Sequence, residues 1–274
     1  MKLFSRHTGN GYPLIIVHGL YGSSDNWLSV AKMLEKHFSI YLVDLRNHGS
    51  SPHSPLHSYE AMALDLNEFI EDNCIEKPIL VGHSMGGKVV MQLGLMYPSK
   101  VRRMVVVDIS PLGSTNARHK RHIFEEHRSI ISILQHLPLE SISSYKEADT
   151  LLGEHIASER LRGFLLKSLS RRQAGFRWKF NLDVLAEQLE SIMSGFDLSN
   201  PAHVNQSSFP MLFIKGAESD YIDDGDRDAI RRFYPESEVV VIGNAGHWVH
   251  AEQQEQFVAV LMAFCRNEAY FLFE

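Results

Sequence analysis

Short apolar runs alternate with longer amphipathic segments at both ends of the chain, and this alternation constrains the fold more than any other feature. The apolar runs are residues 14–17, 40–44, 78–81, 104–108, 211–214 and 239–242. Segments with helical spacing follow them at residues 24–37, 58–73, 85–97 and 226–233, and from about residue 251. Strands that alternate with helices pair in parallel, because each helix carries the chain back across the sheet. We therefore predict an α/β fold with a mostly parallel central sheet flanked by helices.

The block from Leu112 to Phe209 differs from the rest of the chain. It has helical periodicity without β-rich runs, and it carries 12 lysines and arginines against 11 acidic residues, whereas the remainder carries 15 against 22. We expect residues 1–111 and 210–274 to form the core and residues 112–209 to form a helical insertion. Insertions at the carboxyl edge of a parallel sheet lie over the binding site, so we interpret this block as a lid. The alternative is a helical layer without a gating role.

The segment Val81-Gly-His-Ser-Met-Gly-Gly87 joins an apolar run to a helical segment. It is typical of a nucleophile elbow, a sharp turn that holds a serine hydroxyl in an exposed position. Glycines are needed at Gly82 and Gly86 because strand and helix approach so closely that side chains there would collide. The helix that begins at Met85 points free N–H groups toward the substrate. Ser84 is therefore the candidate nucleophile.

A serine hydroxyl is a weak nucleophile, so a hydrolase needs a base to accept its proton. The candidate base is His247, which lies in the glycine-bearing segment Asn244-Ala-Gly-His-Trp248 directly after the last apolar run. The alternative is a histidine that only caps a helix. For His250, three residues later, we expect packing or exposure to solvent.

The developing oxyanion needs hydrogen-bond donors. We predict the backbone N–H groups of Met85, directly after the serine, and of Leu20. Leu20 lies in the loop His18-Gly-Leu-Tyr-Gly22 after the first apolar run, where Gly19 lets the backbone turn inward.

These pieces resemble those of the α/β hydrolases over nearly the whole chain. The resemblance rests on the His18-Gly19 loop, the elbow, the segment Asp44–Ser51 (DLRNHGSS) and the loop around His247. More narrowly, residues 44–49, 176–182 (FRWKFNL) and 245–250 (AGHWVH) are similar to the bacterial short-chain esterase and acyl-CoA thioesterase branch and its mitochondrial abhydrolase-domain relatives. The resemblance implies an α/β-hydrolase fold with an inserted helical lid. We interpret Asp44–Ser51 as an architectural turn that braces the elbow.

The acid behind His247 has two candidates. Most of the superfamily places it in a G-x-x-D turn about 28 residues before the histidine; here that turn is Gly216-Ala-Glu-Ser219, and Asp220 follows one residue late. The esterase branch draws its acid from the end of the strand after the elbow, where this chain has Asp108. Adjacent residues at a strand end point in different directions, so the displacement matters. We predict Asp108, with Asp220 as the alternative. If neither takes part in chemistry, Asp108 would cap a helix or turn and Asp220 would form an Asx turn.

The predicted function is that of a serine carboxylesterase acting on short to medium acyl esters or acyl-CoA thioesters through an acyl-enzyme, without a cofactor. A C–C bond hydrolase or lyase-type synthase on the same triad is the alternative, since one scaffold serves many reactions. A non-catalytic ligand receptor is a further alternative, but none of the serine, histidine or oxyanion glycine is lost. The partner is thus a small ester or thioester.

Aromatic and basic residues in the second half of the insertion suggest how a substrate is bound. Phe176, Trp178 and Phe180 are candidates for the floor of an acyl pocket, although amphipathic packing explains them equally well. Four basic residues are candidates for contact with coenzyme A phosphates: Arg171, Arg172, Arg177 and Lys179.

The composition excludes several classes of function. The formal net charge is −6, without a basic stripe, so we expect no nucleic-acid partner. No apolar run approaches 18 residues, and we predict a cytoplasmic monomer or homodimer without a membrane span. Cys74 and Cys265 are expected to be inert helix residues. No acidic ligand accompanies the pair His119 and His122, so we predict no metal.

Overall fold

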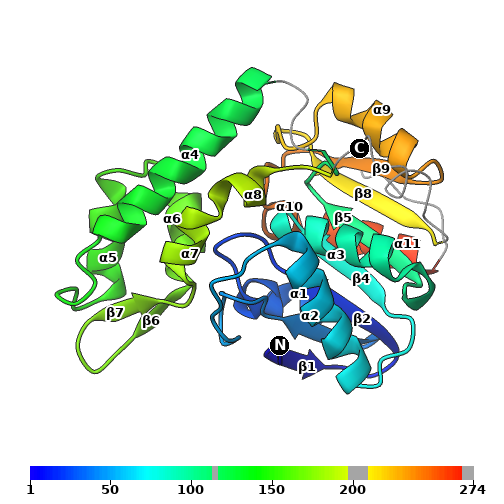
Figure 1. The fold of residues 1–274 in the computed structure, drawn as a ribbon, viewed down its shortest axis with the longest axis horizontal. Helices are drawn as coiled ribbons and strands as arrows, with labels where there is room; N and C mark the ends of the chain where they lie inside the picture. The colour runs from blue at the N-terminus through cyan, green and yellow to red at the C-terminus, as the bar shows by residue number, and fades with distance from the viewer. Residues whose placement is uncertain (113–116, 197–208, 267–274) are drawn as a thin grey trace.

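The computed structural model describes residues 1–112, 117–196 and 209–266 (Figure 1). A helix-covered sheet forms the body of the molecule, and a smaller, mainly helical lobe lies beside it. The lobe is built from the elements between β5 (Arg103–Val107) and β8 (Met211–Gly216). The chain therefore leaves the body after the last residue of β5 and re-enters the sheet at the first residue of β8.

In the described part of the chain, the strands of the body form a seven-stranded sheet in the order β1-β3-β2-β4-β5-β8-β9. Only the edge strand β1 pairs antiparallel, while the other pairings are parallel. This confirms the predicted fold class. The remaining strands are β1 (Ser5–Thr8), β2 (Tyr12–Val17), β3 (Phe38–Val43), β4 (Ile79–His83) and β9 (Glu238–Ile242).

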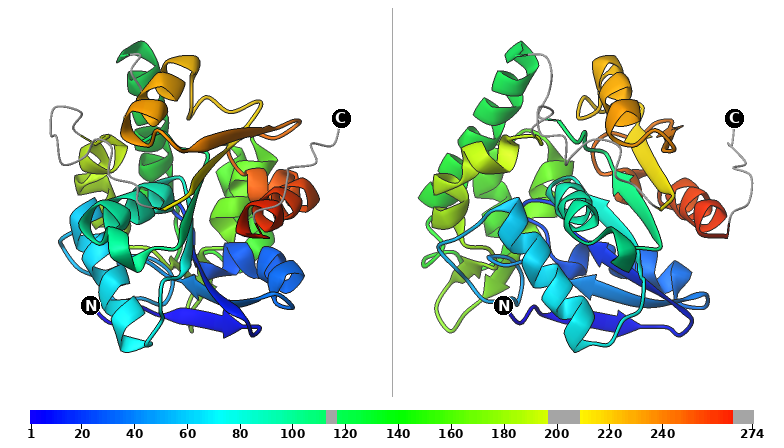
Figure 2. Two further views of the ribbon diagram at one scale, coloured as in Figure 1. Left: turned by 90° about the vertical axis from the view of Figure 1, so that its right-hand side faces the viewer. Right: turned by 45° about the vertical axis from the view of Figure 1, so that its right-hand side comes forward.

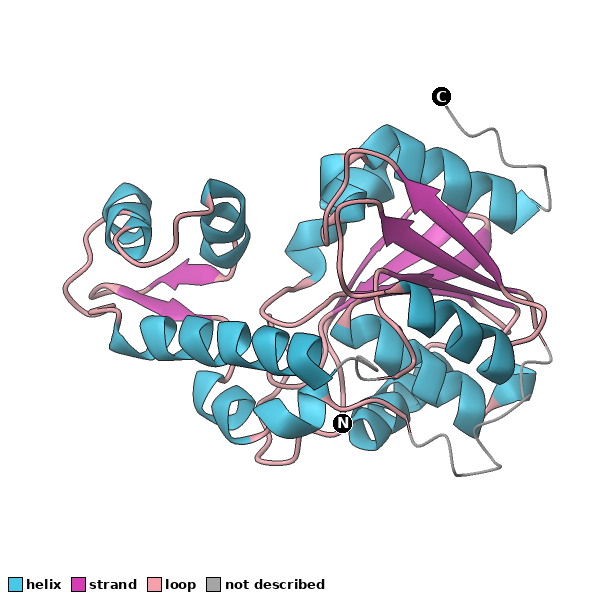
Figure 3. Ribbon diagram, turned by 90° about the horizontal axis from the view of Figure 1, so that it is seen from above, coloured by secondary structure: helices cyan, strands magenta, loops and turns pink. Residues whose placement is uncertain are grey.

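Helices cover both faces of the sheet (Figure 3). Alternate residues of a strand face opposite sides. Leu14 and Ile16 of β2 accordingly pack in one buried cluster with α1 (Leu28–Leu34) and α11 (Gln254–Arg266), whereas Ile15 and Val17 pack in the other, with α2 (Tyr59–Asp72) and α3 (Met85–Met96). The shorter helices of the body are η1 (Ser24–Trp27), η2 (Pro98–Lys100), α9 (Asp224–Phe233) and α10 (Val249–Glu252).

Helix starts follow the capping residues in the sequence. Ser58 caps α2, and its hydroxyl accepts a hydrogen bond from the N–H of Ala61. Asp223 and Asp226 form a reciprocal capping box at the start of α9. Both helices begin within a few residues of the predicted positions, because these side chains satisfy N–H groups that the first turn leaves without partners.

The lobe contains helices and one hairpin. Its helices are α4 (Ala117–His136), α5 (Tyr145–Gly153), α6 (Glu159–Leu166), α7 (Leu182–Glu187) and α8 (Leu189–Met193). Strands β6 (Leu169–Arg171) and β7 (Phe176–Trp178) pair antiparallel, which corrects the expectation of a block without strands. The views of Figure 2 show the lobe against the end of the sheet to which β5 and β8 lead.

Polar contacts fasten the lobe to the body. The Ser168 hydroxyl donates to the carbonyl of Tyr21 (2.6 Å), and the N–H of Asn181 donates to the carbonyl of Asn47 (2.8 Å). Lys179 forms an ion pair with Asp25 at 2.8 Å. These contacts join the lobe to the loops that follow β2 and β3, so any opening of the lobe must break them.

Two further expectations concern membrane spans and cysteines. Within the described residues, no helix is long and apolar enough to cross a membrane. Cys265 lies in α11, as expected, and burial raises the pKa of its thiol to about 12. Cys74 lies outside a helix: it follows the end of α2 in a turn with a φ of 51°. The predicted helical segment, residues 58–73, already ended one residue before Cys74.

Candidate active site

Ser84 occupies the apex of the turn between β4 and α3. Its backbone has φ 51° and ψ −121°, a combination that few non-glycine residues adopt. The Ser84 N–H donates to the carbonyl of Val107 (2.9 Å), which holds the turn against the neighbouring strand. A Cβ on Gly82 would lie 2.3 Å from the carbonyl oxygen of Gly86, and one on Gly86 2.4 Å from that of His18. Glycine is therefore required on both sides of the serine.

Asp108 and His247 meet at the carboxyl end of the sheet. Asp108 is fully buried directly after β5, and its Oδ2 accepts from Nδ1 of His247 at 2.7 Å. The Gly216 N–H donates to Oδ1 of Asp108 (3.0 Å), and the Ser219 hydroxyl donates to Oδ2. Three donors thus converge on one buried carboxylate and fix its orientation toward His247.

The alternative acid, Asp220, lies elsewhere. Its residue is exposed, and it lines a cavity beside Ser84 that His247 does not line. Ser219, one position earlier, is buried and points to Asp108 instead. The one-residue displacement therefore separates Asp220 from the imidazole, and the structure brings His247 together with Asp108.

The His247 ring is held on two sides. Its Nδ1 is bound to Asp108, and the Tyr221 ring stacks on it with centroids 3.8 Å apart and planes at 20°. Because a carboxylate only accepts, Nδ1 carries the hydrogen and Nε2 is left as an acceptor. Ser84 and His247 line the same cavity, without a direct hydrogen bond between them in this state. Such contacts often form only once substrate is bound.

The predicted oxyanion donors flank the serine. Among the described residues, neither the N–H of Leu20 nor that of Met85 has a protein acceptor. The loop that carries Leu20 touches the nucleophile, since a Cβ built on Gly19 would lie 3.1 Å from Cβ of Ser84. Leu20, Ser84 and Met85 line one cavity, and the two N–H groups have no protein acceptor, as the predicted role requires.

Comparison with known proteins shows the family to which the chain belongs. A family model described as alpha/beta hydrolase fold matches residues 12–254. The chain belongs to the α/β hydrolase family. The sn-1-specific diacylglycerol lipase ABHD11 of Mus musculus is 37% identical over 253 residues, which cover 92% of this chain and 80% of that protein.

Two further relatives of this α/β hydrolase are esterases. Esterase YbfF of Escherichia coli (strain K12) is 34% identical over 257 residues, which cover 94% of this chain and 93% of that protein. A solved structure, a marine microorganism esterase, superposes with a TM-score of 0.86 at 41% identity, covering 96% of this chain and 99% of that one. The chain is accordingly a hydrolase of the ester-cleaving class.

Buried histidines surround the site of the hydrolase. His83 donates through Nε2 to the carbonyl of His247 (2.8 Å), and burial holds the pKa of His83 well below its ordinary value. His18 accepts the Leu45 N–H at Nε2 (3.0 Å), and burial lowers its pKa as well. His250 is buried, and its ring stacks on Trp27 with centroids 3.9 Å apart. Of the two expectations for His250, packing and exposure to solvent, the structure shows packing. All three are neutral supports near neutral pH.

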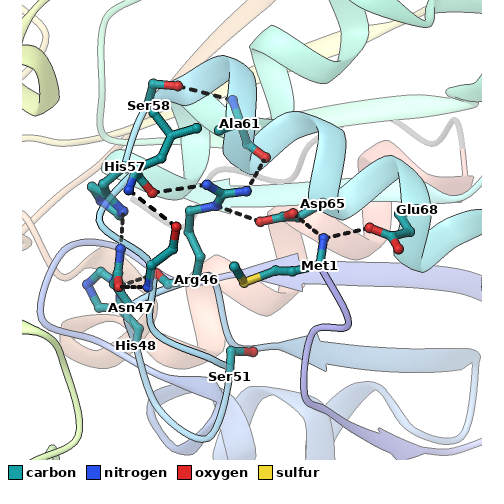
Figure 4. Close-up of polar contacts among 12 residues, drawn as sticks. Met1, Arg46, Asn47, His48, Ser51, His57, Ser58, Ala61, Asp65 and Glu68 are labelled. Carbon is teal, nitrogen blue, oxygen red and sulfur yellow. Dashed lines mark hydrogen bonds and ion pairs between the residues drawn. The ribbon is translucent and has the colours of Figure 1, made fainter.

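The segment Asp44–Ser51 is mostly buried and polar. We expected it to brace the elbow, and its contacts correct this expectation. Arg46 donates to Asp65 of α2 at 2.6 Å and to the carbonyls of Leu56 and Ala61 (Figure 4). Asn47 meets the lobe through Asn181. The segment therefore braces α2, the His18 loop and the lobe rather than the elbow itself.

The residues expected to bind substrate in the insertion do not line the cavities at Ser84. Phe176, Trp178 and Phe180 are buried, and the rings of the last two stack with centroids 5.3 Å apart. Phe180 also packs near Tyr21 and His48 of the body. Packing is therefore the interpretation that holds. The basic residues lie apart from Ser84 as well: Arg171, Arg172 and Arg177 are exposed, and Lys179 pairs with Asp25.

Sequence reasoning missed a hydrogen-bonded group beside the serine. His127 of α4 is bound through Nε2 to the Tyr221 hydroxyl (3.0 Å) and through Nδ1 to the Tyr21 hydroxyl (3.3 Å). Tyr21 directly follows Leu20, a predicted oxyanion donor, and the Tyr221 ring stacks on His247. These residues are about a hundred positions apart in the sequence, and no motif marks them.

No metal centre emerges from residues 1–112, 117–196 and 209–266, where no three His, Cys, Asp or Glu side chains gather around one point. His122 is exposed on α4, and the side chain of His119 lies outside the described residues.

Proposed function

We propose that this hydrolase is a serine carboxylesterase in which Ser84 is the nucleophile, His247 the general base and Asp108 the acid that orients it. The observation that carries the proposal is the Asp108–His247 hydrogen bond of 2.7 Å beside a strained serine. Asp108 keeps the proton of His247 on Nδ1, so that Nε2 can accept the Ser84 proton. It also stabilises the imidazolium that forms.

The reaction proceeds in two halves. Ser84 Oγ attacks the ester carbonyl carbon as its proton passes to Nε2 of His247, and the oxyanion accepts hydrogen bonds from the Leu20 and Met85 N–H groups. The carbon–oxygen bond then breaks, and His247 returns the proton to the leaving alcohol. Water attacks the acyl-enzyme with His247 again as base, which releases the acid and restores Ser84. None of these steps needs a cofactor.

The proposed substrates are short to medium acyl esters. The diacylglycerol lipase and the esterases among the relatives support ester cleavage by the same family. Acyl-CoA thioesters react by the same steps, but the four basic residues expected to meet coenzyme A lie away from the cavities at Ser84. Esters are therefore the preferred class, while the lid role, the cytoplasmic location and the state of assembly stay predictions.

Replacement of the nucleophile tests the proposal. We expect Ser84→Ala to abolish hydrolysis of p-nitrophenyl acetate while circular dichroism and the Tm show an intact fold. Ser132→Ala, at an exposed position of α4, is the matched control and keeps wild-type turnover. Retention of most activity in Ser84→Ala contradicts the assignment. Turnover of a vinylogous diketone without any ester hydrolysis points instead to C–C bond cleavage.

A further inference from the structure

Two cavities meet at Ser84, and they share Leu20, His127 and Tyr221 as common walls. The inner cavity continues between the body and α8, where its lining includes Tyr59, Lys88, Ile109, Ile192 and Met193. The outer cavity continues between the body and α6, where its lining includes Leu161, Phe164 and Trp248. An ester bound at Ser84 has two arms and therefore two different places to put them.

The catalytic base distinguishes the two cavities. His247 lines the outer cavity and not the inner one, whereas Met85, a proposed oxyanion donor, lines only the inner one. His247 must return its proton to the leaving oxygen, so that oxygen has to face the imidazole. With the alcohol arm on the His247 side and the oxyanion between the two N–H groups, the acyl arm is directed into the inner cavity.

The two cavities also differ in size. The inner one has a volume of about 50 Å³ and the outer one about 160 Å³. For scale, an apolar cavity of about 150 Å³ admits benzene. The outer cavity thus has room for a ring or a chain of several carbons, and the inner one for only a few heavy atoms.

Hydrogen bonds fix the wall of the inner cavity. The hydroxyl of the half-buried Tyr59 donates to the carbonyl of Ile192 (2.5 Å), and the ammonium of the buried Lys88 donates to the carbonyl of Ser194. These bonds hold α8 and the residue that follows it against α2 and α3. The outer cavity adjoins a neighbouring pocket, which Phe164 and Trp248 also line.

We propose that the inner cavity binds the acyl arm and the outer cavity the alcohol arm, so that the enzyme prefers esters of short acids with larger apolar alcohols. This preference rests on the proposed esterase function. Ile192 and Met193 limit the acyl chain, while Phe164 and Trp248 receive the alcohol.

Isomeric esters test the proposal, because they exchange the lengths of the two arms at constant composition. Hexyl acetate and ethyl hexanoate are such a pair. We expect kcat/KM to be at least tenfold higher for hexyl acetate in the wild-type protein. Equal values, or a preference for ethyl hexanoate, overturn the assignment of the cavities but leave the esterase function intact. Hydrolysis of neither ester overturns the proposed function itself.

Two variants separate the cavities. Met193→Ala enlarges the inner cavity and is expected to raise the ratio of kcat/KM for ethyl hexanoate to kcat/KM for hexyl acetate severalfold. Phe164→Ala removes a wall of the outer cavity and is expected to lower kcat/KM for hexyl acetate more than for ethyl hexanoate. Both side chains are only half-buried, so a folded protein is expected. Changes in the opposite directions contradict the proposal.

Discussion

At the scale of single residues, Ser219 stands where most of the superfamily carries its acid, and its hydroxyl donates to the carboxylate of Asp108. In the proposed triad, the acid Asp108 thus comes from β5, the strand beside β8, and the serine in the usual position donates a hydrogen bond to it. The sequence placed Ser84 and His247 because each lies in a short motif with a fixed backbone geometry. Asp108 and Asp220 stayed in competition because the direction of a side chain at a strand end depends on neighbouring strands.

Replacing the two acids separately distinguishes them. We expect Asp108→Asn to lower kcat by about 10³- to 10⁴-fold, since the amide no longer fixes the tautomer of His247. Asp220→Asn is expected to stay within a few-fold of wild type, because Nδ1 of His247 is bound to Asp108 and residue 220 is exposed. Steady-state kinetics on p-nitrophenyl acetate measure both. A larger loss of kcat for Asp220→Asn than for Asp108→Asn would show that Asp108 is not the acid of the triad.

We expect the Ser219 hydroxyl to affect catalysis through its hydrogen bond to Asp108 and not through contact with the substrate. A hydrogen bond to a charged group is worth about 1.5–3 kcal/mol, so Ser219→Ala is expected to lower kcat by about 10- to 100-fold if the bond acts in the transition state. KM is expected to change little. The split between kcat and KM is the measurement, and a change confined to KM is inconsistent with a positioning role.

At the scale of elements, the lobe is tied to both halves of the catalytic apparatus through α4. His127 connects Tyr21, beside an oxyanion donor, with Tyr221, which stacks on His247. Helix positions were predictable because capping residues such as Ser58 and periodic apolar faces act locally. The hairpin β6–β7 was not, since three-residue strands are too short for an alternating pattern, and His127 was not, since its partners come from distant segments.

A double-mutant cycle measures the link between His127 and Tyr221. Tyr221→Phe removes the hydroxyl but keeps the ring that stacks on His247, and His127→Leu removes the other partner. We expect Tyr221→Phe to lower kcat by about fivefold, as one neutral hydrogen bond predicts, and His127→Leu to lower it further, because it also breaks the bond to Tyr21. The double variant is expected to lose no more than His127→Leu alone, because the bond between His127 and Tyr221 is already broken there. Fully additive losses rule out the link.

At the scale of the whole molecule, buried histidines accompany the sheet edge that carries the site. Burial lowers the pKa of His57 and His127 to about 4 and that of His250 to about 3. His18, His48 and His83 are shifted in the same direction by burial. These groups are neutral in the folded protein but take up protons near pH 6.5 when the chain unfolds. The buried polar interior thus makes the fold sensitive to acid.

This sensitivity has a defined pH range. The stability contributed by these histidines is fully present above pH 6.5 and is lost as the pH falls toward 4, since the unfolded chain binds more protons. His57 alone accounts for about 3 kcal/mol across that range. Urea denaturation at pH 7.5, 6, 5 and 4.5 is expected to show a steadily falling midpoint. A variant in which His57 is replaced by Phe should show a shallower fall, and a midpoint independent of pH contradicts the prediction.

The central claim is that Asp108 and His247 activate Ser84, and covalent labelling tests it most directly. The wild-type protein is incubated with a serine-reactive fluorophosphonate, and the adduct is located by peptide mass spectrometry. We predict one adduct, on Ser84, forming at least a hundredfold more slowly in Asp108→Asn and in His247→Ala. An adduct on another residue, or labelling of Ser84 at the same rate in all three proteins, contradicts the account.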